Sequence, residues 1–170
     1  MTDPFETLGL PRRFRFERLA LEQRHRDLAR ALHPDRYVEA PALERQLALS
    51  KAVTVNEAYR TLRDPLQRAL ALLRLAGHPI GDRDRPSAEV LMAVMELREA
   101  LDEARADPAR VASLRSQVAS AIAECEALVA EAFDAPEGPD PARLDEARAA
   151  VIKLRYYRRF EEEADSLEAL

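Results

Sequence analysis

The chain contains few of the residues that build disulfide frameworks, phosphate-binding loops or aromatic cores. Its 170 residues include one cysteine, four glycines, no tryptophan and only 5% aromatic residues. A single cysteine excludes an internal disulfide and a thiolate metal cluster made by this chain alone. Scarce glycine disfavours nucleotide-binding folds, because their phosphate loops use several glycines.

Long apolar runs are also missing. No stretch of about 18 apolar residues occurs, so we expect no transmembrane helix. The first residues lack the basic region and apolar core of a signal peptide, and we therefore expect a cytoplasmic protein. The net charge of −5 argues against sequence-independent nucleic-acid binding by the whole chain.

The charge is divided unevenly along the chain. Residues 1–75 carry 14 Lys and Arg against 10 Asp and Glu, whereas residues 76–170 carry 12 against 21. We expect the two halves to face different partners.

The abundant residues favour helices. Alanine, leucine, glutamate and arginine dominate, and all have high helix propensity. Four Asp-Pro pairs each place a capping carboxylate before a proline suited to the first helical position. Apolar residues recur at helical spacing in the stretches 17–32, 41–63, 65–76, 108–134 and 141–166. No segment alternates like a strand, so the pattern predicts an all-α fold.

One polar break interrupts the middle of the chain. Residues 77–86 (GHPIGDRDRP) contain glycine and proline and coincide with the change in charge balance. Domain boundaries usually fall in such segments. The sequence therefore predicts a first domain at 1–76, a linker at 77–86 and a second domain at 87–170.

His33-Pro34-Asp35 stands where the first long helix must end, because the residue before a proline is disfavoured in the α region. Alone, this tripeptide fits an ordinary helix-ending turn. Its surroundings are more specific: a basic helix precedes it, and a second long helix with the pattern AYxxLxDPxxRA follows. The basic residues are Arg24, Arg26 and Arg30.

This arrangement resembles the J-domain of DnaJ-type co-chaperones, from Phe5 to about Leu75. The resemblance implies that His33, Pro34 and Asp35, together with Arg24, Arg26 and Arg30, dock on a DnaK-type chaperone and stimulate its ATP hydrolysis. His25 departs from the family, which usually has Tyr or Phe there. We interpret it as a packing histidine, and note that Asp27 dilutes the basic face.

The helix expected after Ser87 has two unlike faces. Val90, Val94, Leu97 and Leu101 form a narrow core stripe at helical spacing. The residues broadly opposite, with Leu91 at the margin, are Met92, Met95, Glu96, Glu99 and Glu103. Two interpretations stay open: the methionines form a partner-binding surface, or they pack against another helix.

The pattern LMxxMELRExLxE, and the element Lys153-Leu154-Arg155-Tyr156-Tyr157, resemble the HscB-type co-chaperones of iron–sulfur cluster assembly. The resemblance implies a C-terminal three-helix bundle that recruits the scaffold protein IscU for a DnaK-type chaperone, HscA in bacteria. It also implies a bacterial form, since the CxxC pairs of some eukaryotic relatives are missing. The scaffold-binding residues would be Leu91, Met92, Met95, Glu96, Glu99, Glu103 and Tyr156, the last replacing the usual Phe.

No enzyme signature is present. The three histidines lack partners at metal-ligand spacing, and Cys125 falls in an apolar helical stripe, so we expect no catalytic residue, metal or cofactor. Two alternatives remain at this point: a general J-domain co-chaperone for other clients, and a helical adaptor unconnected with chaperones.

Overall fold

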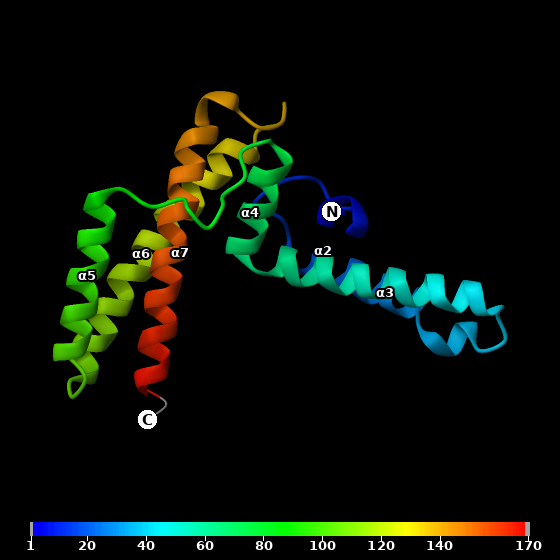
Figure 1. Ribbon diagram of the computed structural model, residues 1–170, viewed down its shortest axis with the longest axis horizontal. Helices are drawn as coiled ribbons and strands as arrows, with labels where there is room; N and C mark the ends of the chain where they lie inside the picture. Colours follow the sequence, from blue (N-terminus) through cyan, green and yellow to red (C-terminus); the bar gives the residue numbers. More distant parts are fainter. Residues whose placement is uncertain (1, 169–170) are drawn as a thin grey trace. The chain divides into compact units, whose positions relative to one another are not determined.

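The computed structural model describes residues 2–168, with side chains up to residue 166, and the described chain is helical without strands. The all-α prediction is confirmed. No helix in this part of the chain combines the length and apolar character needed to cross a membrane. The elements (Figure 1) are α1 Pro4–Leu8, α2 Arg18–Ala31, η1 Pro34–Tyr37, α3 Ala42–Arg63, α4 Pro65–Leu75, α5 Ala88–Glu103, α6 Pro108–Phe133, η2 Pro141–Arg143 and α7 Leu144–Glu168.

The Asp-Pro pairs begin helices as predicted. Asp3 Oδ1 accepts the Phe5 N–H at 2.8 Å, and Asp64 Oδ1 accepts the Gln67 N–H at 2.9 Å. Asp107 and Asp140 cap α6 and η2 in the same way. Each carboxylate satisfies backbone donors that have no partner within the helix.

The chain divides into two compact units, residues 1–77 and 78–170. In the first unit, α2 and α3 form a helical hairpin, and α1 and α4 pack near the end of the hairpin that lies away from η1 (Figure 1). The expected α2 stripe is therefore only partly buried: Leu21 lies in the core, whereas His25, Leu28 and Leu32 are half-buried. The large side chains of this core are Phe5, Leu8, Phe14, Leu21, Val55, Leu62, Leu72 and Leu73.

The second unit is a three-helix bundle in which α5 and α7 run in the same direction and α6 runs opposite (Figure 1). Val94 and Leu101 of α5 are buried, as the core stripe predicts, and Val90 and Leu97 are half-buried. Cys125 is 2% exposed, and this burial raises the pKa of its thiol. It is therefore a core residue.

The segment before α5 belongs to the second unit, which differs from the separate linker predicted at 77–86. Arg148 Nη2 donates to Asp84 Oδ1 at 2.6 Å, and Arg155 Nη1 donates to the Gly81 carbonyl at 3.3 Å. These contacts join the segment to α7. Gly77 follows the end of α4 with a φ of 84°, while the Gly81 carbonyl and the Asp84 carboxylate attach the segment to the bundle.

Candidate functional sites

The His33-Pro34-Asp35 loop is exposed and locally braced. His33 caps η1, with its Nδ1 accepting the Asp35 N–H at 3.3 Å, and Pro34 takes the first position of this turn. Tyr37 donates its hydroxyl to the Ala31 carbonyl at 3.3 Å, which attaches η1 to the end of α2. The His33 and Asp35 side chains are 58% and 86% exposed. The loop thus presents both polar side chains from a short ordered turn.

The three predicted arginines of α2 are exposed but do not share one face. At about 100° per residue, Arg26 and Arg30 lie about 40° apart, whereas Arg24 lies about 160° from Arg26. Arg26 Nη2 donates to Gln23 Oε1 at 3.0 Å. Within residues 2–166, Arg24 and Arg30 make no ion pair. Helical spacing therefore puts Arg26 and Arg30 on one side of α2 and leaves Arg24 on a flank, and Arg26 also pairs with Glu22 at 3.9 Å.

His25 packs in the hairpin, as the sequence interpretation proposed. Its ring stacks on Tyr59, with centroids 4.1 Å apart and planes 16° from parallel. His25 Nε2 lies 2.9 Å from Asn56 Oδ1. Among the described residues, no group of three or more His, Cys, Asp or Glu could hold a metal ion.

The second surface is the outward face of α5. Met92 is 62% exposed, Met95 is 59% exposed and Leu91 is 37% exposed. The interpretation in which the methionines pack inside the bundle is therefore wrong. Glu96, Glu99 and Glu103 are also exposed. We call Leu91, Met92, Met95 and these three glutamates the Met/Glu face.

The carboxylates of this face are not equivalent. Glu103 Oε2 accepts from Arg110 Nη2 at 3.1 Å, so this carboxylate already has a cationic partner. Glu96 and Glu99 form no ion pair with any residue from 2 to 166. An incoming basic partner would meet Glu96 and Glu99 without first breaking a salt bridge.

Tyr156 is half-buried on α7, and an ion pair places it relative to α5. Arg98 Nε and Nη2 donate to the two Glu163 carboxylate oxygens at 2.8 and 2.5 Å. Leu91 lies seven residues before Arg98 on α5, and Tyr156 lies seven residues before Glu163 on α7. Side chains seven residues apart on a helix point within about 20° of the same direction. Because α5 and α7 run in the same direction (Figure 1), this spacing predicts that Tyr156 lies on the side of α7 that faces α5.

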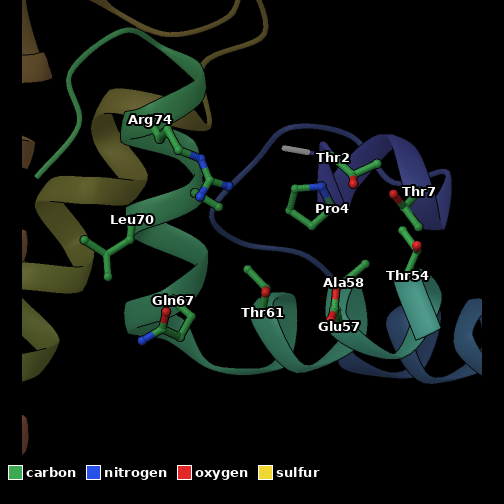
Figure 2. Close-up of a pocket in the computed structure, with 11 residues that line it drawn as sticks. Thr2, Pro4, Thr7, Thr54, Glu57, Ala58, Thr61, Gln67, Leu70 and Arg74 are labelled. Carbon is green, nitrogen blue, oxygen red and sulfur yellow. The ribbon is translucent and has the colours of Figure 1, made fainter.

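A separate hollow of about 200 Å³ lies in the first unit between α1, α3 and α4 (Figure 2). Its walls are mostly polar, and it contains none of the residues predicted to bind a partner. Residues that line it include Thr7, Thr54, Glu57, Thr61, Gln67 and Arg74.

Sequence reasoning missed one role. Arg68, in the DPxxRA part of the motif, donates through Nη1 to the Phe14 carbonyl at 2.7 Å and through Nε to the Leu62 carbonyl at 2.8 Å. Its guanidinium carbon also lies 4.3 Å from the centroid of the Phe16 ring. The sequence RFRF at residues 13–16 contains the two aromatic residues, Phe14 and Phe16, that Arg68 contacts. It was the signal from which the role could have been predicted.

Comparisons with known proteins cover both units of the chain. Residues 86–165 match the family described as "HSCB C-terminal oligomerisation domain". A co-chaperone protein HscB homolog of Aromatoleum aromaticum is 39% identical over 99% of this chain and 95% of its own length. One from Bordetella pertussis is 42% identical over 78% of this chain and 79% of its own length.

Two solved structures share the fold. Chaperone HscB from Vibrio cholerae has a TM-score of 0.84 at 28% identity, covering 99% of this chain and 98% of its own. The human co-chaperone protein HscB has a TM-score of 0.88 at 29% identity, covering 99% and 83%. The similarity therefore includes both units of the chain.

Proposed function

This chain belongs to the HscB family of co-chaperone proteins. We propose that it stimulates ATP hydrolysis by a DnaK-type chaperone, which is HscA in bacteria. We further propose that it delivers the scaffold protein IscU to this chaperone. This activity would assist iron–sulfur cluster assembly and transfer. The chain would act in the cytoplasm as a binding protein. It would catalyse no reaction itself, hold no cofactor, and bind neither nucleic acid nor a membrane.

The observation that carries the proposal is the presence of two exposed surfaces of different chemistry on two compact units. The first unit presents the His33-Pro34-Asp35 loop at the end of the helix that carries Arg26 and Arg30. The second presents an apolar and acidic helix face. A protein that brings a client to a chaperone needs two such surfaces, because it must contact both proteins at once.

The loop suits recognition of a charged chaperone surface. Asp35 can accept hydrogen bonds from a partner arginine, and such charge-assisted bonds are stronger than neutral ones. Pro34 and the cap by His33 restrict the turn before docking, so less conformational entropy is lost on binding. Arg26 and Arg30 would attract an acidic patch and accelerate encounter.

The Met/Glu face suits recognition of a protein scaffold. Met92 and Met95 have flexible thioether side chains that adapt to an irregular apolar surface. Glu96 and Glu99 stand beside them as acceptors for basic groups at the rim. An apolar centre with charges around it is the usual composition of a specific interface.

The test is a single-turnover ATPase assay with HscA, with and without IscU, comparing the unaltered chain with His33→Gln. We expect the unaltered chain to accelerate hydrolysis and His33→Gln to lose this effect, with its melting temperature and IscU binding retained. His78→Gln is the matched control, since it makes the same change in the second unit. Wild-type stimulation by His33→Gln would contradict the proposed role of the loop, and stimulation without IscU binding would indicate a J-protein for other clients.

A further inference from the structure

A second hollow, of about 240 Å³, lies on the second unit beside Tyr156. Three arginines line it, one from the segment before α5 and two from α7. We call it the arginine hollow. Its lining residues are Asp82, Asp84, Arg85, Arg155, Tyr156 and Arg159.

The arginines keep most of their hydrogen-bond donors unused. A guanidinium has five N–H donors. Arg85 Nη1 donates to the Asp82 carbonyl at 2.8 Å, and Arg155 makes only the 3.3 Å bond to the Gly81 carbonyl. Arg159 is exposed, lies with its guanidinium carbon 6.0 Å from the Tyr156 ring centroid, and makes no ion pair within residues 2–166.

The two aspartates do not neutralise this charge. Asp84 is occupied by Arg148 at 2.6 Å and by the Gly81 N–H at 2.7 Å. Its charge is therefore balanced by a cation that does not line the hollow. Arg155 also acts on Asp84, but the Asp84–Arg148 pair is neutral, so three lining guanidinium groups stand against one unpaired carboxylate, Asp82, and the hollow is electropositive.

The hollow adjoins the expected scaffold-binding surface, because Tyr156 lines the hollow and its spacing from Glu163 puts it on the side of α7 that faces α5. Along α5 the acids Glu89, Glu96, Glu99 and Glu103 are exposed, whereas the arginines of the hollow lie only near its first turn. Arg85 precedes the helix, apolar residues 91–95 follow, and Glu96 and Glu99 come next. This extended surface is basic at the arginine hollow, apolar at Leu91, Met92 and Met95, and acidic along the rest of α5.

We propose that the arginine hollow receives a carboxylate side chain of IscU, and that this contact fixes the orientation in which the scaffold binds. The inference rests on the proposed function. A scaffold surface with an acidic group at one end and basic groups at the other fits this surface in one direction only. The reverse direction places like charges together, and such juxtapositions disfavour an interface.

The test uses the full chain and titration calorimetry with IscU at low and high salt. Arg159→Ala should weaken binding about three- to tenfold at low salt, and Arg159→Glu should weaken it further, because it replaces attraction with repulsion. The loss should shrink at high salt, where screening weakens the contribution of the arginine. Arg13→Ala is the matched control: this exposed arginine of the first unit changes the net charge equally, and its binding should equal that of the unaltered chain.

Charge exchange identifies the partner group. Each exposed Asp and Glu of IscU is changed in turn to Lys and titrated against Arg159→Glu. Restored affinity for one such variant supports the inference and names the carboxylate. If the unaltered chain binds IscU and Arg159→Glu binds it equally well, the inference is overturned while the proposed function stands. If the unaltered chain does not bind IscU, both are overturned.

Discussion

Arg68 and Phe14 are 54 residues apart in sequence and are joined by a 2.7 Å hydrogen bond from the arginine Nη1 to the Phe14 carbonyl. The same guanidinium donates to the Leu62 carbonyl at the end of α3 and covers the Phe16 ring. One side chain thus holds the segment before α2 against the α3–α4 corner. The DPxxRA pattern contains a structural arginine, whereas the loop that we propose docks on the chaperone lies at the other end of the hairpin.

Arg68→Lys should destabilise the first unit by about 1–3 kcal/mol, because a lysine cannot reproduce the planar fork that serves two carbonyls and a ring. Arg60→Lys, at an exposed site on α3, should change the free energy of unfolding by less than about 0.5 kcal/mol. Urea denaturation of both variants measures the difference. Equal stability of the two variants would show that Arg68 does not join these segments in solution.

Met92→Ala combined with Met95→Ala should leave the melting temperature nearly unchanged, because both side chains are more than half exposed. The same variant should bind IscU about thirtyfold more weakly, as expected when apolar anchors of an interface are truncated. Calorimetry measures both quantities. Leu49→Ala with Val53→Ala is the control, since these residues are similarly exposed on α3. If the melting temperature falls strongly for the methionine variant and not for the control, Met92 and Met95 pack in the core.

Glu96→Ala and Glu99→Ala should weaken IscU binding more modestly than the methionine variant and should reduce its salt dependence. Glu103→Ala should have the smallest effect, because Arg110 already pairs with that carboxylate in the free chain. Titrations at two salt concentrations rank the three variants. A ranking with Glu103→Ala as the most damaging would contradict the argument from its existing ion pair.

The Asp84 carboxyl should titrate below its ordinary pKa of 3.8, because the Gly81 N–H and then Arg148 stabilise its charged form. A lowered pKa in the folded state means that the stabilisation is present above pH 3.8 and is lost as pH falls through the folded value. NMR titration of the carboxyl group measures the pKa. Asp84→Asn should also speed exchange of the Gly81 amide near neutral pH, whereas Asp82→Asn should leave that exchange unchanged.

A fragment of residues 1–77 should fold alone, because it forms one of the two compact units. It should bind the chaperone and show no affinity for IscU. Moving from low to high salt should slow its association with the chaperone by about tenfold or more, since Arg26 and Arg30 act by steering. Stopped-flow measurements give the rate. Salt-independent association would contradict the steering argument, and IscU binding by the fragment would contradict the assignment of that surface to the second unit.

Local rules were sufficient for much of the fold. Each Asp-Pro pair begins a helix or a helical turn, because a carboxylate and a proline at adjacent positions satisfy the first-turn requirements without outside help. Helical spacing likewise placed Val94 and Leu101 on the inner face of α5 and Cys125 in the core. Spacing also separates Arg24 from Arg26 and Arg30, a consequence that depends only on 100° per residue.

By itself, then, the sequence determined the helices, the inward face of α5, the location of the loop and the resemblance to the family. Only the tertiary structure decided which helix faces are covered by other helices. The burial of a face depends on which elements from elsewhere in the chain pack against it. Met92 and Met95 are exposed because, among the described residues of the second unit, no other helix covers that side of α5. The segment before α5 is attached because Arg148 and Arg155 reach it from α7, and Arg68 joins Phe14 across 54 positions. Such long-range contacts have no local signature in a sequence, since they depend on the positions of whole elements.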